Sequence, residues 1–269
     1  MMIYKPMRHL QTYRLFESTQ DLTPDQQKFL DKGTRGIWSI NPLTGLVDIQ
    51  GDFRCSRQGI KNLHGIRFGS VSGDFECSNN ELTSLEGAPQ TVGRDFECGY
   101  TQLTSLEGAP QTIGRDFSCR HNQLTSLEGA PQTVGRDFDC GYTQLTSLEG
   151  APQTIGEDFY CHGNELTSLK GAPQILGGTF YSSYLDIPEG KWGLETFIDL
   201  SEKGNPREKQ LVAPLVDPKV LQQQIDQNPE GMLVKLKGLL KHPHLQGLRW
   251  PENLVGEVDL LSDLSDIGL

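Results

Sequence analysis

A repeat of 21 residues in the middle of the chain constrains the fold more than any other feature. Phenylalanines recur at this spacing from residue 75 to residue 180, and Phe53 precedes Phe75 by 22 residues. Neighbouring units are nearly identical, with VGRDFECGYTQLTSLEGAPQT followed by IGRDFSCRHNQLTSLEGAPQT. Because so short a unit cannot bury an apolar face alone, successive units must stack. The repeat therefore predicts a solenoid over residues 53–185.

The apolar positions predict the path of each unit. In the segment GRDFxC, phenylalanine and cysteine alternate with polar residues, as in a short strand with one buried face. Leu103 and Leu106 are expected to reach the same interior from the return path, and Ile113 brings the chain back to the core. Gly108 marks a turn and Pro110 excludes a long helix. We expect a parallel sheet on one face and an extended return arm.

This pattern resembles the leucine-rich repeat, and it matches directly at Phe117, Cys119, Asn122, Leu124 and Leu127. It departs from that repeat in using phenylalanine and cysteine where the strand leucines stand. In alternate units, Thr101 and Thr143 occupy the asparagine position. An asparagine side chain can satisfy backbone groups at the bend, and threonine can do so only in part. The threonine-bearing coils are therefore expected to be less regular.

A closer resemblance is to a bacteriophage group with near-identical F-x-C-x-x-N-x-L-T-S-L-x-G-A-P repeats. Proteins of that group also carry an N-terminal segment like YRLFES and an acidic end like VDLLSDLSDIGL, both present here. The resemblance implies a phage-encoded leucine-rich repeat protein, with a fold but no established biochemical activity. Leucine-rich repeat proteins in general recognise macromolecules, usually proteins.

The flanking segments predict short elements at both ends of the solenoid. Residues 1–19 are assigned to an N-terminal tail. Residues 20–52 are expected to form a small α/β cap, with a helix that starts at Thr23 and a hairpin around 41–45. After Phe180 the repeat degrades, and residues 186–269 are expected to form an α-helical C-terminal region.

Three helices are expected in that C-terminal region. In the first, Leu194, Phe197, Ile198 and Leu200 form one apolar face. Asp217 and Pro218 are the expected first residues of one helix. Another is expected within PEGMLVKLKGLLKHP, where leucines up to Leu239 and Leu240 recur at helical spacing.

The overall charge bears on the class of partner. The formal net charge is -11, so the chain is expected to repel phosphate backbones and to attract a basic protein. No apolar run approaches the ~20 residues needed to span a bilayer, and the first residues lack the apolar core of a secretory signal. We expect a protein partner, no direct nucleic-acid or membrane binding, and the cytoplasm of a host bacterial cell as the location.

Two columns of chemically active residues run through the repeat. All six cysteines, from Cys55 to Cys161, stand two residues after the phenylalanine. They suggest either a metal or disulfide ladder or buried thiols, and the absence of a C-x-x-C pair favours buried thiols in a reducing compartment. Aspartates 74, 95, 116, 137 and 158 form a second column, with arginines 94, 115 and 136 placed to compensate three of them. A calcium ladder is one interpretation, but the nonapeptide of calcium solenoids is absent, so aspartates that bond turn amides or the arginines are favoured. We predict no metal and no cofactor.

The positions that vary between units predict the binding surface. One variable position lies between phenylalanine and cysteine, and two more follow the cysteine. Tyrosine, arginine and histidine on one rigid face are typical of protein recognition, although variation between duplicates would also produce such differences. The predicted binding residues are Arg54, Glu76, Glu97, Tyr100, Arg120, His121, Asp139, Tyr142, Tyr160 and His162.

These features favour a non-enzymatic scaffold that binds a host or phage protein through its strand face. No catalytic motif stands in a suitable context, and no cysteine follows Cys161 to act as a C-terminal nucleophile. The alternative is a minor virion component or assembly factor, since Leu15-Phe16-Glu17 matches a site cut by some prohead proteases. A nucleic-acid decoy and an enzyme in the C-terminal helices are further, weaker hypotheses.

Overall fold

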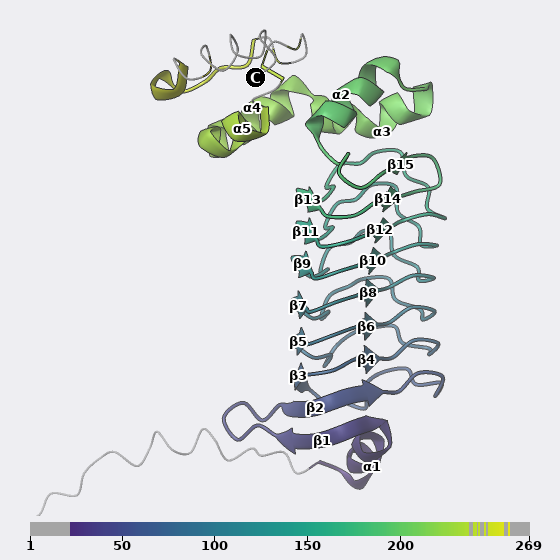
Figure 1. Ribbon diagram of the computed structural model, residues 1–269. Helices are drawn as coiled ribbons and strands as arrows, with labels where there is room; N and C mark the ends of the chain where they lie inside the picture. Colours follow the sequence, from purple (N-terminus) through teal and green to yellow (C-terminus); the bar gives the residue numbers. More distant parts are fainter. Residues whose placement is uncertain are drawn as a thin grey trace, which may run out of the picture.

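The computed structural model describes residues 22–236, 239–240, 242, 245, 247–255 and 258. The predicted N-terminal tail, with its Leu15-Phe16-Glu17 site, lies outside the described residues, as does most of the acidic end. In Figure 1 the coils stack in a single column. A helix and a hairpin lie at the N-terminal end of this column, and helices lie at its C-terminal end.

The predicted parallel ladder of phenylalanine strands is confirmed. Each strand pairs in parallel with the next, phenylalanine opposite phenylalanine, as in the Phe96–Phe117 and Phe117–Phe138 pairs. The strands are β2 (Val47–Arg54), β4 (Phe75–Glu76), β6 (Phe96–Glu97), β8 (Phe117–Ser118), β10 (Phe138–Asp139), β12 (Phe159–Tyr160) and β14 (Phe180–Tyr181).

A second parallel ladder, which the sequence analysis did not predict, precedes the first in every coil. Its strands are β3 (Phe68–Val71), β5 (Thr91–Val92), β7 (Thr112–Ile113), β9 (Thr133–Val134), β11 (Thr154–Ile155) and β13 (Ile175–Leu176). The long strand β2 pairs with both β3 and β4, and so joins the two ladders. The valine and isoleucine positions therefore belong to strands of their own, with the apolar side chain inward.

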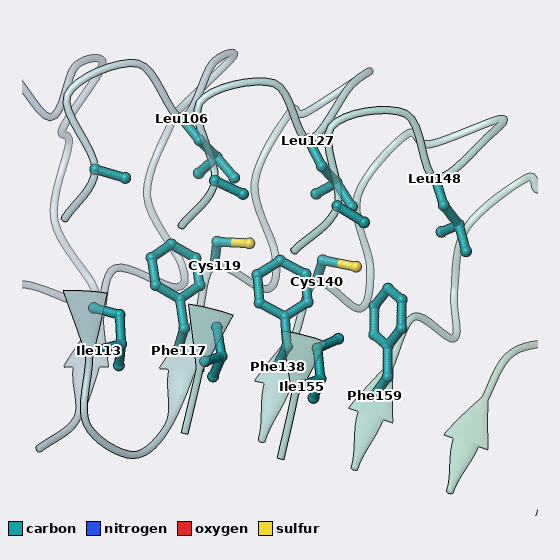
Figure 2. Close-up of a cluster of buried hydrophobic side chains, with 14 of the residues drawn as sticks. Leu106, Ile113, Phe117, Cys119, Leu127, Phe138, Cys140, Leu148, Ile155 and Phe159 are labelled. Atoms are coloured by element: carbon teal, nitrogen blue, oxygen red, sulfur yellow. The ribbon is translucent and has the colours of Figure 1, made fainter. Parts of the chain in front are cut away.

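The interior is built as predicted from phenylalanine, cysteine and leucine. The side chains at these positions in the central coils have no exposed surface, and Figure 2 shows them pointing into a common core. The Phe75, Phe96, Phe117 and Phe138 rings form an offset stack, with planes within 14° of parallel and centroid distances of 5.4 Å. One continuous apolar column thus runs through the coils, because each ring covers the face of the next.

Two glycine columns allow the coils to approach closely. Gly150 has a φ of +86°, and a Cβ there would lie 2.2 Å from the backbone nitrogen of Glu128. At the other position, a Cβ on Gly114 would lie 2.0 Å from the carbonyl oxygen of Gly93. Any side chain at either position would push two backbones apart.

Asparagine side chains tie adjacent coils together at the bend after each cysteine. The amide of Asn122 donates to the carbonyl of Cys119 in its own coil and to that of Cys98 in the preceding coil. Its oxygen accepts from the backbone N–H of Leu103 and from the Thr101 hydroxyl. One buried side chain therefore serves the bends of two coils.

The expectation that the threonine coils are less regular is wrong. Strands in these coils keep the same register as their neighbours. Thr101 donates to the oxygen of Asn122 at 2.6 Å, and Thr143 bonds Asn164 in the same way at 2.7 Å. Threonine is sufficient at this position because the asparagine of the following coil bonds the backbone of the threonine's own bend.

The N-terminal end consists of helix α1 (Pro24–Gly33) and strand β1 (Thr34–Ile40). The side chain of Thr23 accepts from the backbone of Gln26, and Gln26 accepts from the backbone of Thr23 in return. Strand β1 pairs antiparallel with β2 across the turn at 41–46. Phe29 of α1 packs edge-on against Phe53, and so covers the first ring of the core.

The solenoid ends where strand β15 (Asp186–Ile187) reverses direction and pairs antiparallel with β14. Trp192 then lies 5.0 Å from the last core ring, Phe180, and contacts Phe197 edge-on. The helices that follow are α2 (Leu194–Lys203), α3 (Pro206–Val216), α4 (Pro218–Gln227) and α5 (Pro229–Leu236).

The structure adds one C-terminal helix to those predicted and shortens another. Helix α3 starts with a capping box between Asn205 and Glu208, a signal readable in the sequence but obscured by Pro214 inside the helix. Helix α5 ends at Leu236, and Leu239 and Leu240 lie in a turn.

Replacing Asn122 by alanine is predicted to lower the free energy of unfolding by about 3 kcal/mol. The change leaves buried partners in two coils unsatisfied, each costing about 1–3 kcal/mol when water cannot replace the bond. Urea denaturation followed by circular dichroism measures the loss. Exposed Gln123 supplies the matched control, since its replacement by alanine should change stability by less than about 0.5 kcal/mol. Equal effects of the two substitutions would contradict the role given to Asn122.

Candidate protein-interaction face

The predicted binding residues lie in two surface rows along the solenoid and at the position between these rows. The strand row follows each core phenylalanine directly and contains Arg54, Glu76, Glu97, Ser118, Asp139, Tyr160 and, in the last coil, Tyr181. The second position after each cysteine forms the turn row, which contains Arg57, Asn79, Tyr100, His121, Tyr142 and Gly163. Arg120 and His162 lie between the rows, one residue after the cysteine. None of the ten predicted residues is buried in the core.

Turn-row residues share a backbone conformation that side chains rarely adopt. Tyr100, His121 and Tyr142 have φ values of 54°, 53° and 55°. This left-handed conformation costs a residue other than glycine about 1 kcal/mol or more. The bend after the strand imposes it in the coils from Arg57 to Gly163, so that tyrosine and histidine occupy a position favoured by asparagine and glycine.

The three rings of the turn row stack on one another. The Tyr100 and His121 centroids are 4.2 Å apart, and those of His121 and Tyr142 are 4.5 Å apart, with planes within 16° of parallel. The tyrosines remain 43% and 51% exposed. Because the rings cover one another's faces, their edges and polar atoms face outward as a rigid stripe.

Two larger side chains contact this stripe and pack over glycines of the preceding coils. The guanidinium of Arg120 lies 5.4 Å from the centre of the Tyr100 ring. The His162 ring meets Tyr142 edge-on at 5.0 Å. Both arrangements need the preceding coil to carry glycine at the same position, as it does at Gly99 and Gly141. The alternation of glycine with arginine or histidine thus has a packing reason.

Charges in the strand row are unevenly compensated. Arg54 lies 3.0 Å from Asp52, 3.3 Å from Asp74 and 3.2 Å from Glu76. Glu97 has no ion pair among the described residues, and burial raises the pKa of its carboxyl, with further contributions from Glu76, Asp95 and Asp116 that Arg120 opposes.

Towards the C-terminal end the strand row becomes aromatic. Tyr160 stacks on Tyr181 with centroids 4.9 Å apart and planes within 2° of parallel. Its hydroxyl donates to Asp158 at 2.8 Å. Burial raises the pKa of Tyr160, and the bond to Asp158 adds to this effect. The phenol therefore stays protonated at neutral pH and acts as a fixed donor.

The aspartate column bonds to the backbone, as the sequence predicts. Each carboxylate accepts a hydrogen bond from the backbone N–H of the aspartate in the next coil, as in the bond from Asp137 to Asp116. The series begins at Asp52 and ends where Thr179 donates to Asp158. We call these residues the aspartate ladder; its members are Asp52, Asp74, Asp95, Asp116, Asp137 and Asp158.

Arginines one coil further along compensate part of the aspartate ladder. Arg94 lies 3.2 Å from Asp74, and Arg136 lies 3.9 Å from Asp116. The backbone bond from Asp74 lowers the pKa of Asp52, whereas burial raises the pKa of Asp137. The ladder is thus a structural element with a strongly acidic outer surface.

The cysteines are buried free thiols, as predicted. Desolvation by burial raises the pKa of Cys55 to about 12 and that of Cys119 well above its usual value. A buried, protonated thiol is a poor nucleophile and a poor metal ligand. In the part of the chain that the structure describes, no group of three or more histidine, cysteine or acidic residues is arranged to hold a metal ion.

Sequence reasoning missed three contributors to this surface. Asp52 directly precedes Phe53, as the other ladder aspartates precede their phenylalanines, so the repeat pattern was sufficient to predict its place in the ladder. Tyr181 is the strand-row residue of the last coil and had the same signal. The left-handed backbone of the turn row was only weakly indicated, by Asn79 and Gly163, because asparagine and glycine favour this conformation.

Comparison with known proteins adds no relative to this description. No family model matches the chain, and neither a curated protein nor a solved structure matches it at a significant level. None of the helices in the described ranges has the length and apolar character needed to cross a membrane.

Removing one carboxylate of the aspartate ladder should destabilise the solenoid through the lost backbone bond. For Asp116→Ala we expect a loss of about 1 kcal/mol in the free energy of unfolding, because the N–H of Asp137 loses its acceptor. Asp116→Asn is the matched control, since its amide oxygen still accepts and one like charge disappears; its effect should stay below about 0.5 kcal/mol. Equal losses in urea denaturation would show that charge matters more than the bond.

Alkaline pH should destabilise the fold through the thiols. Their folded-state pKa values are raised, so above pH 9 the unfolded chain releases protons that the folded chain keeps. Stability is then lost with rising pH, by up to about 1.4 kcal/mol per thiol for each pH unit. Urea denaturation at pH 8 and pH 10 measures the change. Cys119→Ala should lose less stability between the two pH values than the unmodified chain, and an equal loss would contradict this origin.

Proposed function

We propose that this protein is a non-enzymatic scaffold that binds another protein through the face formed by the strand row and the turn row. The exposed stacked stripe of Tyr100, His121 and Tyr142 carries this proposal. Tyrosine is enriched at the energetic centres of interfaces because it offers a large contact area and a polar edge. A stripe held by ring stacking and a fixed backbone loses little entropy on binding.

The electrostatics of the same face support a basic partner. The aspartate ladder and the acidic members of the strand row lie side by side, and the net charge of the whole chain is -11. An acidic surface of this kind raises the association rate of a positively charged protein and disfavours nucleic acid.

Details of the repeat support assignment to the leucine-rich type. An asparagine that bonds the bend backbone and a leucine pair on the return arm are the features the two share. We propose that α1 with the β1–β2 hairpin, and the C-terminal helices, cap the two ends of the core. The proposal includes a phage origin and action in the host cytoplasm, on the strength of the repeat resemblance.

A photo-crosslinking experiment tests the binding face. A benzoylphenylalanine in place of Tyr142 should capture a defined partner from host or infected cells, identified by mass spectrometry. The matched control places the same group at exposed Gln132, next to the second ladder, where capture of that partner is not expected. The triple variant Tyr100→Ala, His121→Ala, Tyr142→Ala should reduce affinity for the identified partner at least tenfold.

Two results would contradict the proposal. Equal capture of the partner from positions 142 and 132 would indicate that the partner contacts the solenoid nonspecifically, and not through the proposed face. Unchanged affinity of a folded triple variant would remove the stripe from the interface.

A further inference from the structure

A shallow cleft opens between the strand row and the turn row near the N-terminal end of the solenoid. Its lining comes from three successive coils and consists of Ser56, Arg57, Glu76, Ser78, Asn79 and Glu97. Two carboxylates from adjacent coils, Glu76 and Glu97, lie opposite each other in parallel register. The cleft therefore combines acidic groups with hydroxyls at a place that the ring stripe does not occupy.

The two carboxylates differ in what neutralises them. Arg54 lies 3.2 Å from Glu76, so this charge is already matched within the protein. Glu97 has no ion pair within 4.0 Å in the described part of the chain, although its neighbours Asp95 and Asp116 each have an arginine at 3.8–3.9 Å. Arg120 acts on Glu97 electrostatically, but its guanidinium pairs with Asp139 at 3.8 Å, so Glu97 has no close counterion of its own.

Two buried hydroxyls beside Glu97 also lack partners. The Ser78 and Ser118 hydroxyl oxygens are buried and make no hydrogen bond in the described structure, and each residue is only 8% exposed. Ser78 lines the cleft, and Ser118 pairs with Glu97 in the strand register. Because buried polar groups are nearly always bonded, an orphaned hydroxyl next to an unpaired carboxylate indicates a missing donor.

From this arrangement we infer that Glu97 receives an arginine side chain from a basic segment of the partner protein. A guanidinium carries one positive charge and several donors in a plane, so that it can bond a carboxylate and a neighbouring hydroxyl together. A divalent cation fits less well, because Arg54 and Arg57 lie close by and only one charge is unmatched. The inference rests on the proposed function and names the chemistry of the partner.

The same observation predicts how the free protein responds to loss of this charge. A half-buried carboxylate without a counterion costs desolvation and gains little in return. Glu97→Gln should therefore leave the urea midpoint of the free protein unchanged or raise it. A lower midpoint would mean that Glu97 supports the fold, and would overturn the inference.

Binding of a labelled peptide of alternating arginine and glycine, followed by fluorescence anisotropy, tests the site. Glu97→Gln should weaken binding about tenfold, the loss typical of one charge-assisted hydrogen bond. Glu107→Gln is the matched control, because this exposed glutamate lies on the return arm of the same coil; it should change affinity less than twofold. Ser78→Ala should give a smaller loss than Glu97→Gln, and a lysine–glycine peptide should bind less tightly than the arginine peptide.

Three results would overturn the inference. They are the absence of peptide binding, equal weakening by Glu97→Gln and Glu107→Gln, and equal binding of the arginine and lysine peptides. Crosslinking separates this failure from failure of the proposed function. If Glu97→Gln leaves capture of the partner at position 142 undiminished, the arginine site is wrong and the binding face stands. Selective peptide binding without capture at position 142 would instead support the arginine site and remove the ring stripe from the interface.

Discussion

Everything in this protein depends on the in-register stacking of one coil on the next. A single coil of 21 residues has almost no interior, and its strands are only two residues long. Each coil is stabilised by the next one. The next coil packs a ring against its phenylalanine, and the carbonyl groups of the next coil accept hydrogen bonds from its backbone N–H groups, including those at the bend. Stability is therefore a property of neighbouring pairs, as in other repeat proteins, and the two ends of the column need different structures.

The same stacking fixes the surface chemistry. A residue at a given repeat position stands directly beside its equivalents in the coils above and below. Like side chains are brought into rows whether or not they attract one another. Aromatic rings are stabilised by this arrangement because they stack, as in the turn row. Arg120 and His162 fit because the preceding coils have glycine at the same repeat position. The rows are rigid because the backbone beneath them is fixed, which suits a recognition surface.

Stacking brings like-charged carboxylates close together, which costs electrostatic free energy. The aspartate ladder and Glu97 differ in how this cost is offset. The aspartate ladder tolerates its own repulsion because every member accepts a backbone hydrogen bond from the next coil, and arginines lie close to several members. Glu97 forms no ion pair within 4.0 Å in the described part of the chain, and only Arg120, which pairs with Asp139, opposes the effect of burial on it. A charge left unmatched within an otherwise compensated array is more informative about a partner than the total acidity of the face.

The repeat alone determined the coil boundaries, the buried phenylalanine, cysteine and leucine positions, and the outward-facing rows, because a period of 21 residues leaves few ways to bury the same positions in every copy. Three things were decided only by tertiary structure. The second ladder at Val92 and Ile113 forms between coils, so no two-residue segment reveals it. Asn122 serves the bend of the preceding coil, which made Thr101 sufficient there. The unpaired state of Glu97 depends on which arginine reaches which coil, and sequence spacing does not fix the reach of a long side chain.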